Sequence, residues 1–499
     1  MSKHIAMLCT PLDSGSVEPH IVELAKQLRR EGNDVTVFSK GGVYVASLEE
    51  ADVRHINTPL HSKFPLALLR SYFILLKEFK RNRPSVVHSH TRTCNFISRL
   101  ICRRLNLPMV LSQNTDSSEK ELSINQMVSD AKASYNDAID LLRPMDYMIS
   151  GYYGKNNFGD DLTLHGLMNH LKDYKGSVLT CDTNNTEVPA NVHLIHRFNL
   201  WKIRKVMKRT KVFLFGSGSI LQDATSTRSI FYYYIIMKMA LLYRCKTMLY
   251  ANGIGPLFKE SNRKNVARIL KRIDLITLRD EDSVKLLKEL QPKRDAFLTQ
   301  DDAFSYDVRS IPAVSRPKRA QGKTIVGINF KFKNEQDPKI KQIADALQIL
   351  AQKHQLYYYL IPYHSLQDIR PLKALHNELK NCAELVAKAN NPESVIAHAA
   401  SCKYQIVERL HGQIISTMLA QPFLPIDYDP KTKAFAEQTG MTPYLIHHNA
   451  LEKDRFIKNF EQIMEQKEEI ALRLSAFCEE AKKDAALNRE HLYQIIKDF

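Results

Sequence analysis

The stretch that decides the fold is IAMLCTPLDSGSVEPHIVELAKQLRREGNDVTVFS, residues 5–39. It holds a short apolar run, a Gly/Ser loop, a helical pattern and a second apolar run. Within the helical pattern Ile21, Leu24, Ala25 and Leu28 recur at helical spacing, and Gly32 ends the helix. A strand, a helix and a strand in this order predict a βαβ unit with parallel strands.

The same alternation continues along the chain. Further strands are expected at SVVHSHT (85–91) and MVLSQ (109–113), so residues 1–115 are predicted to form a Rossmann-like domain. Residues 116–145 are polar and lack glycine, which favours a helical linker. A second β/α series starts after it, a basic segment with two prolines (311–323) separates this series from a third, and helices close the chain. We therefore expect α/β domains at 146–315 and 320–499 after the N-terminal one.

Length and composition indicate a soluble protein of several domains. A chain of 499 residues with 44% apolar and 25% charged residues exceeds one ordinary core. The apolar stretches Phe64–Leu76 and Ile230–Tyr243 are shorter than the roughly 20 residues of a membrane helix. Eight cysteines without a C-x-x-C pair argue against structural zinc and a disulfide framework, and favour a cytoplasmic location.

The formal net charge of +17 points to an anionic partner. Each basic cluster taken alone is an ordinary solvated helix face; the clusters are Lys77–Arg104, Lys202–Lys211, Lys259–Arg272 and Arg316–Lys323. No nucleic-acid-binding motif accompanies the charge, so we expect no nucleic-acid partner. An anionic membrane or a lipid-diphosphate substrate explains it equally well, which leaves peripheral contact with the inner membrane face open. The oligomeric state is also left open.

The N-terminal domain resembles half of a known family. SGSVEPHIVELA (14–25), DVTVFS (34–39) and VVHSHT (86–91) resemble the acceptor-side half of retaining GT-B glycosyltransferases. The loop at Gly15 would let backbone N–H groups approach an anion. His88 and His90 end a strand, where they are either ligand-binding or ordinary strand-end histidines. The Glu-x7-Glu arrangement of that family's donor half is missing downstream, so this domain is expected to bind an acceptor glycan or to pair subunits.

The rest of the chain carries six motifs in a fixed order. They are ISGYYGKNNFGDD (149–161), FGSGSILQDATSTRS (215–229), MLYANGIGPL (248–257), LITLRDEDSVKLL (275–287), QDDAFSY (300–306) and ERLHGQIISTMLAQPFLPIDYDPKTKAF (408–435). This ordered set resembles the polysaccharide pyruvyl transferases, most closely the bacterial branch that modifies a lipid-linked cell-wall disaccharide. The resemblance implies a GT-B-like pair of Rossmann-type domains with phosphoenolpyruvate as the donor substrate and no separate cofactor.

The chemistry of this reaction asks for definite groups. Cationic side chains must hold the carboxylate and phosphate of the donor, a general acid must protonate the enol carbon, and no metal is required. The resemblance implies that Arg279, His411 and Lys431 meet around phosphoenolpyruvate, with His411 as the proton donor. Without it, Arg279 would be a surface arginine paired with Asp280 or Asp282, and Lys431 one exposed lysine among many.

Other residues of these motifs are expected to bind substrate or to shape the loops. Arg409 serves the same anion or braces its own loop through Glu408. Asp160 is expected to cap a helix in the first β/α turn, with a structural or acceptor-binding role favoured over a catalytic one. The remaining candidates are Asn157 and Asp161 in that turn, and Gly216, Gly218, Ser219 and Gln222 in the second, glycine-rich loop.

The expected reaction joins pyruvate as a cyclic ketal across two hydroxyls of one sugar and releases phosphate. The acceptor implied by the resemblance is a 4,6-linked N-acetylmannosamine or similar hexose of a lipid-linked or cell-surface glycan. Two alternatives remain. One is a nucleotide-sugar-dependent GT-B glycosyltransferase whose diphosphate is held by Arg279 and Lys431. The other is a non-catalytic glycan-binding scaffold of polysaccharide assembly.

Overall fold

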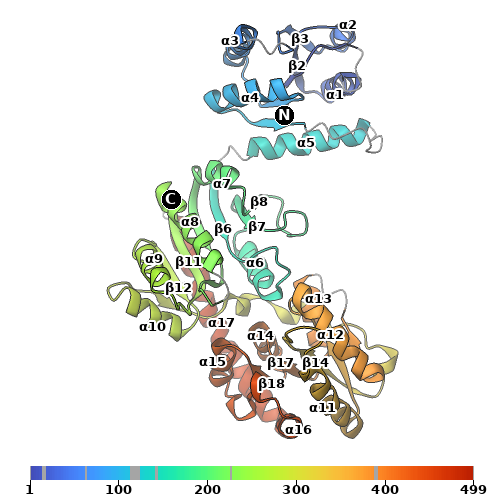
Figure 1. The fold of residues 1–499 in the computed structure, drawn as a ribbon, viewed down its shortest axis with the longest axis vertical. Helices are drawn as coiled ribbons and strands as arrows, with labels where there is room; N and C mark the ends of the chain where they lie inside the picture. Colours follow the sequence, from blue (N-terminus) through green and yellow to red (C-terminus); the bar gives the residue numbers. More distant parts are fainter. Residues whose placement is uncertain are drawn as a thin grey trace. The chain divides into compact units, whose positions relative to one another are not determined.

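The chain divides into two compact units, Met1–Pro144 and Met145–Phe499. The computed structural model, shown in Figure 1, describes residues 2–13, 18–61, 65–112, 124–140, 144–224, 227–386 and 391–497. The Gly15 loop, the first part of the segment expected as a linker and two residues of the Ser/Thr-rich turn (225–226) lie outside these ranges.

The first unit is a parallel Rossmann-type sheet in the order β3-β2-β1-β4-β5. Its elements are β1 (His4–Leu8), α1 (Glu18–Arg30), β2 (Asp34–Ser39), α2 (Val45–Glu49), β3 (Arg54–Asn57), α3 (Pro65–Arg81), β4 (Val86–Ser89), α4 (Arg92–Leu105), β5 (Met109–Leu111) and α5 (Ile124–Asp140). The predicted helical residues Ile21, Leu24, Ala25 and Leu28 are all buried in its core. The strand β3 was not predicted, because RHIN is mostly polar.

The helix α5 falls where a linker was expected, yet its contacts belong to the first unit. It packs against α1 and β5, and Val128, Ala131 and Tyr135 are buried in the same core as the first strands. The division between units comes after Pro144, beyond this helix. The polar composition of residues 116–145 suggested a linker, because it hides the apolar side chains that α5 buries on one face.

The second unit contains two parallel sheets. The first half has the strand order β13-β12-β11-β9-β6-β7-β8, with β10 paired to β11. Its elements are β6 (Met145–Ser150), α6 (Phe158–His170), β7 (Gly176–Thr180), β8 (Val192–His196), α7 (Leu200–Met207), β9 (Thr210–Phe215), β10 (Gly218–Leu221), α8 (Thr227–Leu242), β11 (Lys246–Ile254), α9 (Glu260–Leu270), β12 (Leu275–Leu278), α10 (Glu281–Leu290) and β13 (Phe297–Leu298).

The second half has the strand order β16-β15-β14-β17-β18-β19. Its elements are β14 (Thr324–Asn329), α11 (Lys339–His354), β15 (Leu356–Leu360), α12 (Ser365–Leu379), β16 (Ala383–Leu385), α13 (Pro392–Ala400), β17 (Tyr404–Val407), α14 (Leu410–Met418), β18 (Phe423–Asp427), α15 (Pro430–Gln438), β19 (Ile446–His447), α16 (Lys453–Glu465) and α17 (Lys467–Lys497). Short 3-10 turns join them, among them Asp302–Ser305 and Lys318–Ala320. The expected pair of Rossmann-type halves is confirmed.

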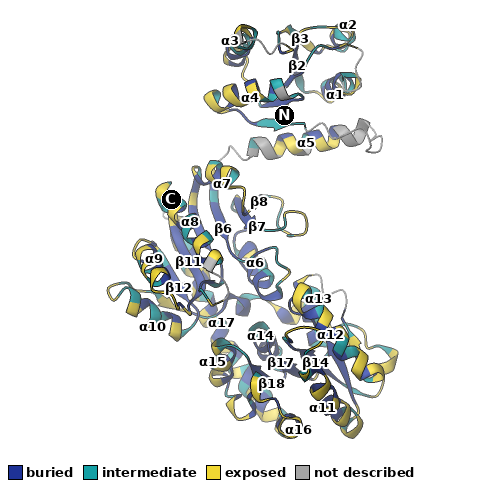
Figure 2. Ribbon diagram, in the orientation of Figure 1, coloured by how far each residue is buried: buried dark blue, intermediate teal, exposed yellow. Residues whose placement is uncertain are grey.

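Two features join these halves into one unit. The long helix α17 packs against β9, β11 and β12 of the first sheet, where Leu492, Ile495 and Ile496 enter the core. The segment 311–323, expected as an interdomain linker, is packed as well: Ala320 is fully buried, and the amide of Val314 donates to the carbonyl of Ala397 at 3.3 Å. Figure 2 shows the strands of both sheets buried and the outer helix faces exposed. Within the described ranges no helix combines the length and apolarity needed to cross a bilayer.

Candidate active site

A cavity of about 260 Å³ lies between the two halves, where strands of both sheets end. Its walls come from the ends of β11, β12, β13, β17 and β18 and the first turns of α10, α14 and α15. Open α/β sheets place ligands at this edge, and helix N-termini carry partial positive charge. The polar lining residues are Arg279, Asp280, Asp282, Gln300, Asp301, Asp429, Lys431 and Gln438.

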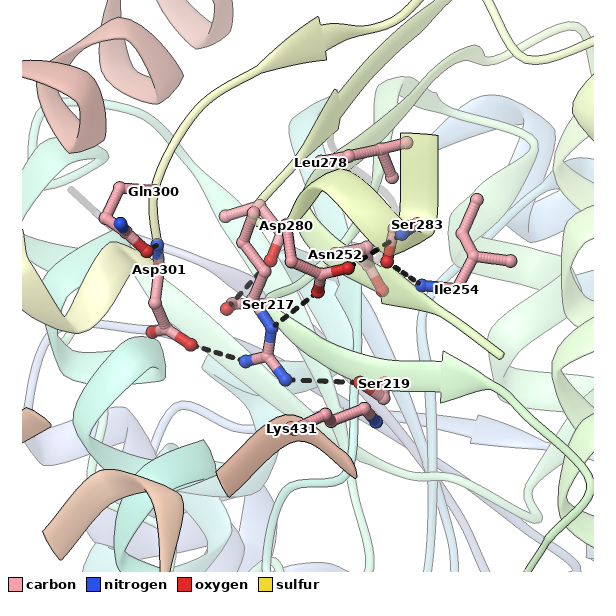
Figure 3. A network of polar contacts seen from close by, with 12 residues as sticks. Ser217, Ser219, Asn252, Ile254, Leu278, Asp280, Ser283, Gln300, Asp301 and Lys431 are labelled. Carbon is pink, nitrogen blue, oxygen red and sulfur yellow. Dashed lines mark hydrogen bonds and ion pairs between the residues drawn. The ribbon is translucent and has the colours of Figure 1, made fainter. Parts of the chain in front are cut away.

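Arg279 follows β12 and is buried, with 8% of its surface exposed. Its guanidinium makes an ion pair with Asp301 and donates to the Ser219 hydroxyl at 3.2 Å (Figure 3). Asp280, the expected surface partner, is farther away at 3.9 Å and caps α10 through the amide of Ser283. The surface interpretation of Arg279 is therefore wrong, because β12 points the side chain into the cavity and not to solvent.

Asp301 is the functional candidate that the sequence analysis missed. It is buried, pairs with Arg279 and lies 3.8 Å from Nε2 of His411. Burial opposes its ionisation, but Arg279, His411 and the amide of Ala303 outweigh burial and lower the pKa of Asp301. The available signal was the QDDAFSY motif, which the resemblance already placed in the ordered set.

His411 lies in the first turn of α14 and contacts the first half across the cavity edge. A Cβ atom on Gly159, in the first turn of α6, would lie 2.0 Å from Nδ1 of His411, so only glycine lets the ring sit there. Burial lowers the pKa of His411, the Asp301 carboxylate opposes this shift and Arg279 adds to it. In the described structure Nε2 of His411 has no hydrogen-bond partner within the protein.

Lys431 lines the same cavity from the first turn of α15, whose N-cap is Asp429. Burial lowers the pKa of Lys431 to about 8, and the nearby charge of Arg279 contributes. Asp429, Asp280 and Asp160 oppose the shift. Arg279 of the first half and Lys431 of the second half thus face one cavity. Two cationic side chains in one cavity suit the binding of a small dianion.

Asp160 lies inside the first turn of α6, where Asn157 is the N-cap residue. The Asp160 carboxyl accepts a hydrogen bond from the side-chain amide of Asn157. Its Oδ1 atom would lie 3.1 Å from a Cβ atom placed on Gly218. The expectation that Asp160 caps the helix is therefore wrong, because its side chain turns towards the glycine-rich loop. Burial and the neighbouring Asp161 raise the pKa of Asp160 to about 8, against the opposing charge of Arg279.

Asp161 turns to a different side of α6 from Asp160. It lines a small cavity with Asn156 and His165, away from the cations of the main cavity. Burial raises the pKa of Asp161 to about 7. The two adjacent carboxyls therefore face different surroundings, and Asp160 alone is close to Arg279 and Asp301.

The glycine-rich loop is shaped by contacts that leave no space for side chains. A Cβ on Gly216 would lie 1.8 Å from the hydroxyl of Tyr153, and Gly218 has a φ of +122°. Asn252 braces the loop by donating to the carbonyls of Phe215 and Gly216 at 2.9 and 2.8 Å. Ser219 holds Arg279, as above, whereas Gln222 lies just beyond β10 and does not line the main cavity. The loop thus positions Arg279 and Asp160 together.

Two known protein families match separate parts of this chain. The polysaccharide pyruvyl transferase family matches residues 157–430, which is more than half of the chain. The chain belongs to the polysaccharide pyruvyl transferase family. A second family, Glycosyltransferase Family 4, matches residues 17–139 in the N-terminal unit. Together the two matches identify a glycan-modifying transferase with a glycosyltransferase-like domain in front of its pyruvyl transferase domain.

Several solved structures of low sequence identity are similar to this chain. MnaA of S. aureus with UDP matches at a TM-score of 0.49 and 12% identity, over 71% of this chain and 96% of that chain. The UDP-GlcNAc 2-epimerase of Neisseria meningitidis, bound to UDP-GlcNAc, has a TM-score of 0.48 and 14% sequence identity. The match covers 70% of this chain and 100% of that chain. A glycosyltransferase from Rickettsia africae has a TM-score of 0.35 and 12% sequence identity, and the match covers 100% of this chain and 98% of that chain. A search of curated proteins finds no match.

Arg409 has a different partner from the one expected. It forms an ion pair with the buried Asp368, whose carboxylate also accepts the amides of Tyr363 and His364 at 3.1 and 2.9 Å. The expected brace through Glu408 is therefore wrong, since Glu408 accepts the amide of Lys331 at 2.5 Å instead. Arg409 does not line the main cavity. Arg409 thus ties the start of α14 to the start of α12.

Metal ligands were not expected in this site. Among the residues that the structure describes, no group of three or more histidine, cysteine or acidic side chains could hold a metal ion. Arg279, Lys431 and the N-termini of α10, α14 and α15 offer positive charge to an anion in this cavity.

Proposed function

We propose that the protein transfers pyruvate from phosphoenolpyruvate to a sugar as a cyclic ketal and releases phosphate. The observation that carries the proposal is the cavity in which Arg279, Lys431, Asp301 and, at its edge, His411 gather from four separate loops. Its volume of about 260 Å³ is small beside the roughly 300–1,000 Å³ of drug-sized ligand pockets, and suits a small dianionic donor.

Donor binding rests on the two cations. The guanidinium of Arg279 is fixed by Asp301 and Ser219, so it is preorganised to meet the carboxylate or phosphate of phosphoenolpyruvate. Lys431 supplies a second positive charge, and α14 begins without a side-chain cap, which leaves its positive end towards the cavity.

His411 is the proton donor in this proposal. Burial and Arg279 keep its pKa low in the free protein, and the negative charge of a bound donor reverses that effect. Donor binding therefore protonates the acid that the reaction needs. His411 then delivers its proton to C3 of phosphoenolpyruvate, and C2 becomes electrophilic.

Asp160 is the base that receives the proton of the attacking sugar hydroxyl. It stands on the opposite half from His411. Arg279 favours its ionised form, and the raised pKa of about 8 makes that carboxylate a stronger base than an ordinary one. The first hydroxyl oxygen bonds to C2. The C2–O bond to phosphate then breaks, the second hydroxyl attacks C2, and its proton leaves with the phosphate. One proton gained at C3 and two lost from hydroxyls balance when the product is hydrogen phosphate.

The acceptor in this proposal is a hexose of a lipid-linked or cell-surface glycan, pyruvylated at its 4- and 6-hydroxyls, with N-acetylmannosamine as the first sugar to test. The support is the family's activity on polysaccharides and the glycosyltransferase-like domain in front. A lipid-linked acceptor would place the protein at the cytoplasmic face of the inner membrane, where the net charge of +17 favours anionic lipid.

The test is phosphate release from phosphoenolpyruvate with a panel of sugar and lipid-diphosphate sugar acceptors. Acceptor-dependent release, with an acid-labile pyruvyl group on the product by mass spectrometry, is expected for the wild type and not for His411→Ala. Cleavage of a nucleotide sugar without phosphate release from phosphoenolpyruvate would instead establish a glycosyltransferase. Glycan binding without turnover in either assay would instead indicate a non-catalytic glycan-binding scaffold.

A further inference from the structure

Two neighbouring helices of the N-terminal unit expose large apolar side chains. On α3, Leu66, Leu69 and Phe73 are 82%, 52% and 57% exposed, and on α4 Phe96 and Leu100 are 59% and 48% exposed. An isolated exposed leucine is ordinary, but five large apolar residues on two adjacent helices are not. We call this surface, together with its basic residues, the α3–α4 face.

The apolar residues of each helix lie on one side. Leu66, Leu69 and Phe73 follow at intervals of three and four, as do Phe96 and Leu100, which is the spacing of one helical face. The helices contact each other, and Arg104 donates to the hydroxyl of Tyr72 at 2.9 Å. The opposite sides of both helices are buried in the core of the unit through residues such as Leu75, Phe79, Ile97 and Ile101. The apolar exposure therefore has no structural role within the unit.

The charges on this face have one sign. Exposed arginines and lysines alternate with the apolar residues: Arg70, Lys77, Lys80, Arg81, Arg99, Arg103 and Arg104. The sequence of the two helices contains a single acidic residue, Glu78, which forms an ion pair with Arg54 at 3.1 Å. The face is thus both apolar and cationic.

This combination distinguishes between partners. A second copy of the chain would place the same face opposite itself in a two-fold dimer, and like charges would repel. A nucleic acid would use the arginines but leave the leucines and phenylalanines without a role. A bilayer with anionic lipids uses both, since arginines meet head groups while leucine and phenylalanine enter the interface.

We propose that the α3–α4 face is a docking surface for a membrane containing anionic lipids. It needs no spanning helix, because an interfacial surface inserts only its apolar side chains. The inference does not depend on pyruvyl transfer. If the acceptor is lipid-linked, docking would also place the protein where its acceptor is found.

The experiment is co-sedimentation of the full chain with vesicles of phosphatidylcholine alone or mixed with phosphatidylglycerol. Wild type is expected to bind the anionic vesicles and not the neutral ones. Arg70→Gln/Arg99→Gln/Arg103→Gln should weaken the partition coefficient on the order of 100-fold at low salt. Leu69→Ser/Phe73→Ser/Phe96→Ser/Leu100→Ser should weaken it more than about 10-fold.

A matched control uses exposed apolar residues of the second unit. Trp201 and Leu242 are 69% and 71% exposed and also have lysines nearby, so Trp201→Ser/Leu242→Ser changes comparable side chains elsewhere. This variant should bind as wild type does, and all variants should keep the thermal midpoint, since the changes are at the surface. The proposal is overturned if wild type ignores anionic vesicles, if the α3–α4 variants bind normally, or if the control loses binding equally.

Discussion

Both units place histidines at or just after the end of a parallel strand, and the two arrangements differ in what surrounds the ring. His88 and His90 belong to the end of β4, whereas His411 follows β17 by four residues. Nδ1 of His88 is 2.6 Å from the Tyr135 hydroxyl of α5, and its Nε2 is 2.7 Å from the Ser112 hydroxyl. His411 instead meets a glycine and the edge of a cavity.

The surroundings set the protonation of these rings. Burial lowers the pKa of His88 to about 4, and burial together with His88 also lowers the pKa of His90 well below its usual value. Near His411 the carboxylate of Asp301 opposes the effect of burial. A strand end therefore offers a histidine to a ligand only if no other element covers it and an acidic group supports its charged form.

The largest difference between the two sites should appear on removing each ring. His411→Ala should lower kcat by about 10²- to 10⁴-fold, because it removes the general acid. His88→Gln should leave pyruvyl transfer within about threefold of wild type, because its partners Tyr135 and Ser112 belong to the first unit. Acceptor-dependent phosphate release measures both. Equal losses would contradict the separation of roles.

The acidic support of the site can be tested on two adjacent residues. Asp301→Asn should lower kcat/KM on the order of 100-fold, because it leaves the buried charge of Arg279 without its partner. Asp302→Asn is the control: burial raises the pKa of Asp302 to about 7, and an amide oxygen can still accept from the Tyr250 hydroxyl, 2.8 Å away. Steady-state kinetics with varied phosphoenolpyruvate should show the contrast, and an inactive Asp302→Asn would argue against it.

The close approach at His411 can be tested on two glycines of the same helix. Gly159→Ala should lower kcat by about 10- to 100-fold, because its methyl group would displace the His411 ring. Gly166→Ala meets only the Asp302 carboxylate at 3.5 Å, an ordinary contact, and should raise stability by up to about 1 kcal/mol. Activity and thermal midpoint together check this pair. A fully active Gly159→Ala would show that the ring has room to move.

The smallest effect concerns Lys431 and pH. Its pKa is about 8, so the free protein loses this charge as the pH rises through 8, and kcat/KM for phosphoenolpyruvate should fall about tenfold per unit above it. Lys431→Arg should move this alkaline limb to higher pH, because the guanidinium stays charged. The pH profile of kcat/KM measures the shift. An unchanged limb in the variant would assign it to another group.

The sequence by itself determined the α/β class, the three β/α series and the ordered motifs, because periodicity and turn residues are local properties. Arg279, His411 and Lys431 were named through the resemblance to a family, since the sequence patterns alone show only that they follow strands. The sequence alone missed β3, whose residues are mostly polar. It took α5 for a linker, because the polar residues of the segment hide the apolar face that α5 buries.

Only the tertiary structure decided which side chains meet. Arg279 and Asp301 meet because the neighbouring strands β12 and β13 end at the same edge of their sheet. Arg409 meets Asp368 because the segments after β17 and β15 lie at the same edge of the second sheet. Gly159 and His411 come from the two halves, which α17 holds together. Such pairings follow from sheet order and packing, which the spacing of residues along the chain does not encode.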